Sequence, residues 1–328
     1  MRRLALVLVL ASVGVGLTFT SPSAAAPPSC AAIAAREPQL AHNESAPAPA
    51  MFAKDFPAIP DCEWGYRLGG FGGIHRNAPR THVPVIFVHG NQVDAENWFL
   101  VRDQFRKAGY TDQELWALSY NGLENAGSGM PTQAAPDADS QAYWQANPSA
   151  LANGGKGAAD DVNVPDLWRF TLTVMDYTHS QQVDFVAHSL GVTIVRKMLY
   201  DHPWFRSHVP AAVMIAGANH GTSVCRGLDT QWYGCDEIAP GTAWLAQLNS
   251  KGEAPRPTCW MSVYDGLEGD PLFVGPDEQS PHLAGAYNVT YPGAYHNDLR
   301  VDPQIVAGYL LFIEGFGQRL QRSCPRLN

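Results

Sequence analysis

Residues 183–191 read Val-Asp-Phe-Val-Ala-His-Ser-Leu-Gly, and these nine residues carry the strongest indication of the fold. The mostly apolar run 183–186 is typical of a buried strand, and a segment with helical periodicity follows the quoted residues. Ala187 and Gly191 are small, which allows strand and helix to approach closely on either side of Ser189. We therefore predict a strand, a tight turn and a helix that lift the Ser189 hydroxyl above a sheet, as an activated nucleophile requires. The alternative is an ordinary turn in which a serine caps the helix.

Apolar runs that fit strands alternate along the chain with segments that fit helices. Strands are predicted at residues 85–88, 115–118, 183–186, 212–215, 260–264 and, more weakly, 287–290. Helices are predicted at residues 97–108, 165–178, 191–201, 242–250 and 303–321. In the second helix Asn163 is the expected cap and Pro165 belongs to the first turn. The alternation predicts an α/β fold with a mostly parallel sheet, helices on both faces, and chemistry at the carboxyl ends of the strands.

The amino terminus has the features of a secretory signal peptide. Two arginines precede an apolar run at residues 4–19, and a stretch of small residues follows. We expect residues 1–26 to be the signal peptide, residues 27–82 an Ala- and Pro-rich arm, and residues 83–328 the main domain. A retained membrane anchor is the alternative, but the run is short for a bilayer and no later stretch is longer. The mature protein should therefore be secreted without a stable membrane anchor.

The composition is that of a globular enzyme. Hydrophobic residues make up 45% of the chain and charged residues 16%, which provides the side chains for a large core and excludes a disordered chain. The net charge is −9 and no run of Lys or Arg offers a phosphate-binding face. Nucleic acid is therefore not expected as a partner.

The cysteines all follow the predicted cleavage point: Cys30, Cys62, Cys225, Cys235, Cys259 and Cys324. An even number of cysteines in an exported chain predicts disulfides, although the sequence alone leaves the pairing open. Loop closure favours Cys30 with Cys62 and Cys225 with Cys235, which leaves Cys259 to pair with Cys324. Their spacing does not fit a metal site, so no metal is expected.

A second motif is the run 85–91, Val-Ile-Phe-Val-His-Gly-Asn. An enzyme that transfers acyl groups needs two backbone N–H groups aimed at the oxyanion that forms during the reaction. One is expected from Leu190, directly after the candidate nucleophile, and the other from Asn91, with Gln92 as the alternative. His89 is expected to brace this loop rather than to transfer protons.

The general base has to be chosen among eleven histidines. In the predicted fold the chain order is nucleophile, acid, base. His296 follows the last predicted strand and precedes the last helix, where its ring can reach Ser189. His282 leads into a strand, and His220 follows the nucleophile by one strand and could line the pocket. We therefore predict His296 as the base.

The acid should follow the strand at residues 260–264, where Asp265, Asp270 and Glu268 are candidates. Asp265 directly ends the strand, whereas Asp270 begins a turn and an apolar run that could fix a carboxylate below the imidazole. Its role would be to orient the base and stabilise the imidazolium. We favour Asp270 and keep Asp265 as the alternative.

These motifs resemble those of the secreted α/β-hydrolase lipases called class 2 and of the related extracellular polyhydroxybutyrate depolymerases. The likeness includes Ala-His-Ser-x-Gly after an apolar strand and His-Gly after the first core strand, and it covers about residues 83–315. Such lipases place the acid at the position of Asp270. The resemblance implies an α/β-hydrolase fold and serine ester hydrolysis through an acyl-enzyme, with no cofactor. It assigns Ser189 as nucleophile, Asp270 as acid, His296 as base, and Asn91 and Leu190 as oxyanion donors.

The chain carries a long Gly-, Ala-, Asn- and Pro-rich insertion at residues 121–164. Loops of this length inside a compact domain are usually functional, so a lid over Ser189 is one interpretation and a solvated insertion is the other. The expected partner is an ester substrate on a lipid or polyester surface, and the expected state is a monomer. We favour a lipase or esterase, and the alternatives are a polyester depolymerase, an acyltransferase and a non-catalytic binding protein on the same scaffold.

Overall fold

The computed structural model describes residues 50–59, 68–91, 93–120, 160–226, 235–317 and 324. The predicted signal peptide, most of the arm, residues 121–159 of the insertion with its possible lid, Cys30, Cys62 and Gln92 lie outside this set. The expectations stated for them therefore stay predictions. Within the described ranges, no helix combines the length and the apolar character needed to cross a bilayer.

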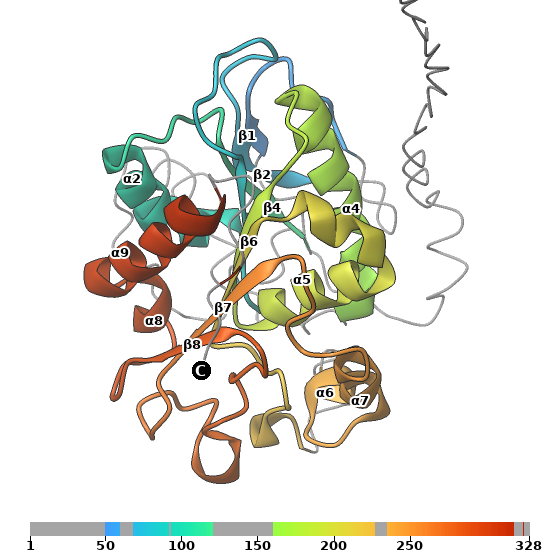
Figure 1. Cartoon of the computed structure of the whole chain (residues 1–328), viewed down its shortest axis with the longest axis vertical. Helices are drawn as coiled ribbons and strands as arrows, with labels where there is room; N and C mark the ends of the chain where they lie inside the picture. The colour runs from blue at the N-terminus through green and yellow to red at the C-terminus, as the bar shows by residue number, and fades with distance from the viewer. Residues whose placement is uncertain are drawn as a thin grey trace, which may run out of the picture.

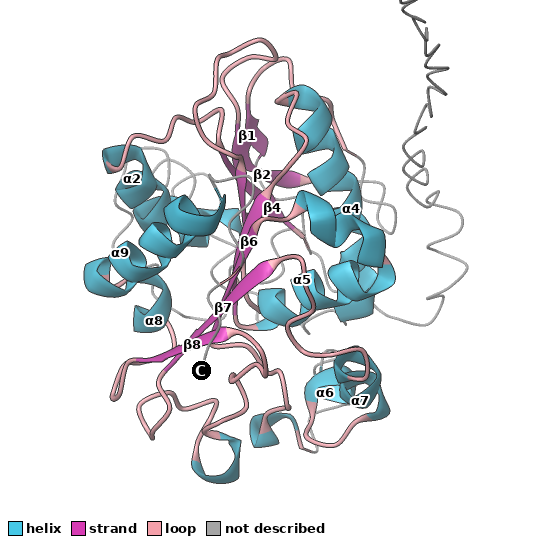
Figure 2. Ribbon diagram, viewed as in Figure 1, coloured by secondary structure: helices cyan, strands magenta, loops and turns pink. Residues whose placement is uncertain are grey.

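The described strands form one sheet that runs through the middle of the molecule (Figures 1 and 2). In chain order they are β1 (Ala50–Phe52), β2 (Gly69–Gly72), β3 (Val85–Val88), β4 (Leu115–Ser119), β5 (Asp184–His188), β6 (Ala211–Ile215), β7 (Cys259–Tyr264) and β8 (Tyr287–Thr290). Their order across the sheet is β1-β2-β4-β3-β5-β6-β7-β8. All neighbouring pairs are parallel except β2 and β4, which are antiparallel.

Helices cover both faces of this sheet. The α-helices are α2 (Phe99–Lys107), α4 (Asp160–Tyr177), α5 (Leu190–Asp201), α6 (Cys235–Ile238), α7 (Ala243–Asn249), α8 (Asp298–Val301) and α9 (Pro303–Phe312). Turns of 3₁₀ helix are η1 (Ala95–Trp98), η4 (Pro203–His208), η5 (Ser223–Cys225) and η6 (Gly275–Asp277), and the π-helical turn η7 (Ile313–Gly317) follows α9. Figure 1 shows α4 and α5 on one face of the sheet and α2, α8 and α9 on the other.

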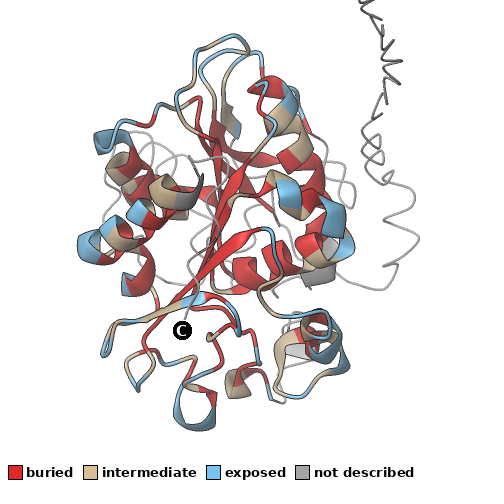
Figure 3. Ribbon diagram, in the orientation of Figure 1, coloured by how far each residue is buried: buried red, intermediate tan, exposed pale blue. Residues whose placement is uncertain are grey.

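A hydrophobic core lies on each face of the sheet because side chains alternate along the strands. In β3, Ile86 and Val88 pack in the cluster that includes α4 and α5, whereas Val85 and Phe87 pack in the cluster that includes α2 and α9. All four side chains are fully buried, and the strands in the centre of the sheet are buried along their length in Figure 3. Strands buried on both faces are nearly continuous apolar runs, which is why the sequence located them.

The strand order, the antiparallel β2 and the helix that follows β5 directly make this an α/β-hydrolase fold, as predicted. The six predicted strands agree with β3 to β8 to within two residues at either end. The last helix is shorter than predicted, because α9 ends at Phe312 and continues as the π-helical turn.

Two strands were not predicted, because β1 and β2 lie in the segment that the sequence suggested was an arm. The composition of β2 is Gly-Gly-Phe-Gly, which is typical of turns. In the folded chain β2 pairs with β4, and Phe71 is buried with its ring 5.4 Å from that of Phe99. The pairing with β4 is a tertiary contact that the local sequence does not encode.

The predicted start of α4 is wrong. The helix begins at Asp160, so Asn163 lies inside it and does not cap it, and Pro165 lies beyond the first turn. Proline is favoured only in the first turn of a helix, where backbone N–H groups have no helical partner.

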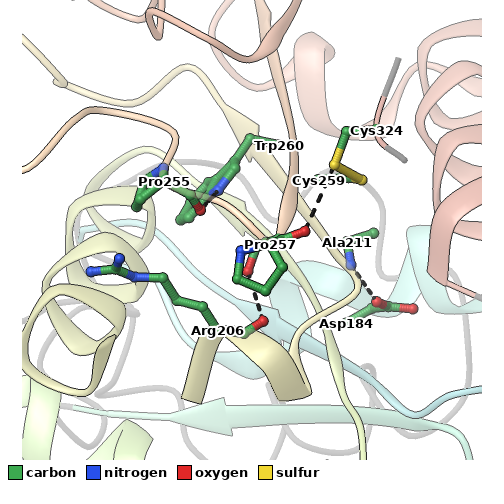
Figure 4. Close-up of a disulfide and its surroundings, with 9 residues drawn as sticks. Asp184, Arg206, Ala211, Pro255, Pro257, Cys259, Trp260 and Cys324 are labelled. Carbon is green, nitrogen blue, oxygen red and sulfur yellow. Dashed lines mark hydrogen bonds between the residues drawn. A yellow bond between two sulfur atoms is a disulfide. The ribbon is translucent and has the colours of Figure 1, made fainter. Parts of the chain in front are cut away.

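A disulfide between Cys259 and Cys324 joins the start of β7 to the carboxyl-terminal segment, with 5.3 Å between the Cα atoms (Figure 4). This pairing is the one predicted from loop closure. The bond lies beside Pro257, whose carbonyl oxygen is 3.7 Å from Cys324 Sγ. Cys225 is also disulfide-bonded. The pairings proposed for the other four cysteines stay predictions.

Candidate active site

Ser189 occupies the tight turn between β5 and α5, with φ 56° and ψ −125°. This left-handed backbone is disfavoured for a residue with a side chain and costs on the order of 1–3 kcal/mol. The surrounding structure holds it, since the Ser189 N–H donates to the carbonyl of Ile215 in β6 at 2.8 Å. The turn is therefore the strained corner that the sequence predicted, and Ser189 is half-buried at its tip.

The loop after β3 packs directly against this turn. A Cβ atom built at Gly191 would lie 2.3 Å from the His89 carbonyl oxygen, so only glycine allows this approach of the two backbones. A Cβ atom built at Gly90 would lie 3.3 Å from Ser189 Oγ. The His-Gly-Asn loop therefore borders the hydroxyl of the candidate nucleophile.

Asp270 and His296 form a buried hydrogen-bonded pair. His296 Nδ1 and Asp270 Oδ2 are 2.8 Å apart, and the two residues are 8% and 1% exposed. An ionised carboxylate can only accept, so Nδ1 is the donor, and in the neutral form of this imidazole Nε2 carries the lone pair. The other oxygen, Asp270 Oδ1, accepts from the Leu272 N–H at 3.0 Å. This arrangement gives His296 the tautomer that a general base needs.

His296 lies next to the turn that carries Ser189. Its carbonyl oxygen is 3.0 Å from Nε2 of His188, the last residue of β5, and the two imidazole rings are 4.6 Å apart. Because the carbonyl accepts, His188 Nε2 is the donor. The structure therefore brings the segments of Ser189, Asp270 and His296 to the carboxyl ends of β5, β7 and β8.

Asp265, the alternative acid, faces backbone N–H groups instead of an imidazole. Its Oδ2 accepts from Leu267 N at 3.0 Å, Gly269 N at 2.8 Å and Asp270 N at 3.4 Å. Its Oδ1 accepts from Gly293 N. Asp265 thus joins the loop that carries Asp270 to the loop that carries His296, and it is 2% exposed.

The His-Gly-Asn loop is braced by two aromatic side chains. His89 Nδ1 is 2.8 Å from the Gly90 carbonyl oxygen and donates to it, and the His89 ring stacks on Tyr120 with 3.8 Å between centroids. The Tyr120 hydroxyl donates to the carbonyls of His89 and, at 3.4 Å, Gly90. Complete burial lowers the pKa of His89 to about 3, so the ring is neutral and cannot supply protons near neutral pH.

The remaining candidates lie elsewhere. His220 is hydrogen-bonded to Glu253, with 2.9 Å between Nε2 and Oε1, and its Nδ1 lies 3.0 Å from the Ser280 carbonyl oxygen. His282 is half-buried and directly follows a turn, and Glu268 is exposed between the two aspartates. Across the described part of the chain, no three His, Cys, Asp or Glu side chains are grouped to hold a metal ion.

A model of the family described as "Lipase (class 2)" matches residues 82–133 and 155–267, which together make up half of the chain. The chain belongs to the class 2 lipase family. The matched segments include Ser189 and both oxyanion candidates, Asn91 and Leu190. Asp270 and His296 lie beyond them, so the proposal for these two residues depends on the geometry described above.

Solved structures similar to this chain include lipases and an esterase. The mature lipase BlEst2 of Bacillus licheniformis has a TM-score of 0.49 and 12% identity, over 74% of this chain and 96% of that one. Lipase B of Aspergillus fumigatus has a TM-score of 0.49 and 16% identity, over 75% and 58%. The esterase Pf2001 of Pyrococcus furiosus has a TM-score of 0.46 and 14% identity, over 82% and 99%. None of the curated proteins compared with the sequence matches it.

Three residues of the folded chain have contacts that the sequence did not predict: Tyr120, His188 and Asp265. Tyr120 follows β4 with no motif to mark it, and its contact with His89 arises only because β3 and β4 are neighbours in the sheet. His188 stands inside the serine motif, but its hydrogen-bond partner is 108 residues away in the chain. Asp265 was recognised as a candidate acid, whereas its contacts with two loops depend on the folded chain.

Proposed function

We propose that this class 2 lipase is a secreted serine hydrolase of carboxylic esters, with Ser189 as nucleophile, His296 as base and Asp270 as the acid that orients the base. The observation that carries the proposal is the buried Asp270–His296 hydrogen bond beside the strained turn of Ser189. A base with a fixed tautomer next to a serine held in a disfavoured backbone conformation is the arrangement that activates a hydroxyl.

The reaction follows from these groups. Ser189 Oγ attacks the ester carbonyl while His296 Nε2 takes the hydroxyl proton, and the tetrahedral intermediate carries a negative oxygen. The intermediate then collapses, the alcohol leaves with the proton from His296, and an acyl-enzyme remains. Water attacks the acyl-enzyme by the same route, which releases the carboxylic acid and restores Ser189. Asp270 stays ionised and stabilises the imidazolium in both steps.

Backbone N–H groups of Leu190 and Asn91 are the proposed oxyanion donors. Leu190 begins α5, so its N–H belongs to the first turn, where no intrahelical acceptor exists. Asn91 N–H belongs to the same planar peptide as the Gly90 carbonyl and points the opposite way. His89 and Tyr120 hold that carbonyl, and they thereby fix the direction of the Asn91 N–H before substrate binds.

Replacing Tyr120 by phenylalanine tests this preorganisation. We expect Tyr120→Phe to lower kcat about tenfold with little change in KM, since a direct oxyanion donor contributes about 10²–10³-fold and Tyr120 acts on one indirectly. Steady-state kinetics on a soluble ester measure the effect. Tyr177→Phe is the matched control, because the Tyr177 hydroxyl donates to Asp55 at 2.5 Å on another element. Equal kcat values for both variants and the wild type would exclude the role of Tyr120.

The proposed substrates are uncharged, lipid-like esters, because the chain belongs to a lipase family. The Cys259–Cys324 disulfide supports a secreted protein, since disulfides persist in oxidising compartments. Export also agrees with the signal-peptide pattern of residues 1–26. A polyester depolymerase and an acyltransferase would use the same Ser189 chemistry, so the substrate has to be decided by experiment.

Labelling and a substrate panel test the proposed function. An alkyl phosphonate that reacts with activated serines should label the purified mature protein on the peptide that contains Ser189, as mass spectrometry would show. The panel compares a triglyceride emulsion, amorphous polyhydroxybutyrate and a soluble short-chain ester, with and without an acceptor alcohol. Clearance of the emulsion supports a lipase, clearance of the polymer alone a depolymerase, and ester formation with the alcohol an acyltransferase. Absence of both labelling and hydrolysis would contradict the proposal.

A further inference from the structure

The segment Gly293–His296, which carries the candidate base, is held at both ends by buried side chains of other elements. At its start, the Gly293 N–H donates to Asp265 Oδ1. At its end, the His296 carbonyl accepts from His188 Nε2 at 3.0 Å. Asp265 and His188 are each 2% exposed, so water competes little for either contact. Two fixed ends define the position of the short segment between them.

Asp265 also fixes the segment that carries the acid. Its second oxygen accepts the N–H groups of Leu267, Gly269 and Asp270, so one carboxylate holds the acid loop and the base segment together. The two segments are in backbone contact, because a Cβ atom built at Gly269 would lie 2.6 Å from the carbonyl carbon of Gly293. The separation of Asp270 and His296 therefore depends on Asp265, although Asp265 does not touch the imidazole pair.

His188 connects the base segment to the nucleophile. It is the last residue of β5 and the residue before Ser189, so its bond to His296 couples the base directly to the turn that carries the hydroxyl. Burial and the nearby His296 and Arg300 hold the pKa of His188 well below its ordinary value. The ring is therefore neutral and does not repel the imidazolium that forms on His296 during the reaction.

We propose that His188 and Asp265 are positioning residues that place His296 between Asp270 and Ser189. The proposal depends on the proposed function for its kinetic consequences, but not for the geometry itself. Catalysis tolerates little displacement, since a shift of about 1 Å can reduce a rate on the order of 100-fold. Neither residue reaches the reacting atoms through the contacts described, so both act through His296.

The first test uses substitutions that separate the hydrogen bond from the space the side chain fills. His188→Leu removes the donor, and we expect kcat to fall about 10–100-fold with KM nearly unchanged. His188→Gln keeps an N–H donor on a side chain of similar reach and should recover a large part of the lost kcat. His208→Leu is the matched control, because His208 Nδ1 donates to the Gln181 carbonyl at 2.8 Å on the surface.

The second test removes the carboxylate. Asp265→Asn replaces one accepting oxygen by an NH₂ group that faces backbone N–H donors, and we expect a similar loss in kcat. Asp184→Asn is its control, because the buried Asp184 accepts the Ala211 N–H at 2.8 Å away from the imidazole pair (Figure 4). Both residues fix the same segment. The fold-loss in kcat of the double variant Asp265→Asn/His188→Leu should therefore be smaller than the product of the two single fold-losses.

A spectroscopic measurement tests the positioning without activity. The proton between His296 Nδ1 and Asp270 Oδ2 should give a downfield ¹H NMR signal in the wild type and in both controls. The signal should shift upfield or broaden in His188→Leu and Asp265→Asn, and His188→Gln should restore it. Variants that fold and keep both the signal and wild-type kcat would overturn the proposal while leaving the proposed function intact. A wild type that shows the signal but neither hydrolyses esters nor reacts with the phosphonate would overturn the proposed function. The positioning roles of His188 and Asp265 would then be decided by the NMR signals of their variants.

Discussion

Replacing Ser189 by alanine is expected to lower kcat for ester hydrolysis by about 10⁶-fold, as the loss of a serine nucleophile does in enzymes of this chemistry. Without Oγ no acyl-enzyme can form, and His296 has no hydroxyl to activate. The oxyanion donors and the binding surface remain, so a small residual rate above the uncatalysed reaction should persist. An assay with a soluble chromogenic ester and an excess of purified variant measures both the loss in kcat and the residual rate.

The fold of this variant should be unchanged. Alanine keeps the backbone N–H that donates to Ile215, and it disfavours the φ of 56° about as much as serine does. Thermal unfolding should therefore give a Tm close to that of the wild type. Ser207→Ala is the control, because the Ser207 hydroxyl is exposed and donates to the Trp204 carbonyl at 2.9 Å. Activity within tenfold of the wild type in Ser189→Ala would remove Ser189 from the mechanism.

The parts of the fold that the sequence predicted are those with a local signal. The runs at β3 and β6 are apolar at every position because both faces of the sheet are covered, and Ser189 stands between a strand and a helix. The parts that the sequence did not predict depend on tertiary contacts. A glycine-rich stretch such as β2 becomes a strand only because β4 pairs with it.

The same contrast between local signals and tertiary contacts holds for the candidate site. The order of Ser189, Asp270 and His296 along the chain could be predicted, because in this fold the acid and the base follow successive later strands. The sequence favoured Asp270 but kept Asp265 as the alternative acid, since both residues follow β7 within a few positions. In the folded chain they differ in what they face. Asp270 contacts the imidazole of His296, whereas Asp265 contacts four backbone N–H groups.

The hydrogen bonds that hold the candidate site in place were the least predictable feature, because they join residues that are distant in sequence. His188 contacts a carbonyl 108 residues later, and Tyr120 contacts a carbonyl 31 residues earlier. No spacing rule marks such pairs, since they follow from which strands are neighbours. The sequence therefore predicts the candidate catalytic residues better than the residues that hold them in place.

Substitution of Asp270 by asparagine should lower kcat by about 10⁴-fold while KM changes little. In the wild type, Asp270 Oδ2 accepts the Nδ1 hydrogen of His296, which leaves Nε2 free to take the Ser189 proton. Asparagine can present its NH₂ group to Nδ1, and the hydrogen then moves to Nε2, where it blocks the base. The rate of phosphonate labelling should fall in parallel, because it depends on the same proton transfer.

The neighbouring acidic residues provide a graded comparison for this prediction. Asp265→Asn should lower kcat far less, by about 10–100-fold, because Asp265 acts on His296 only through the backbone. Glu268→Gln should leave kcat unchanged, because Glu268 is exposed and makes none of the contacts described at the imidazole. Steady-state kinetics of the three variants on one soluble ester rank their losses in kcat directly. A larger loss in Asp265→Asn than in Asp270→Asn would transfer the role of the acid to Asp265, and the Asp270–His296 hydrogen bond would then be structural.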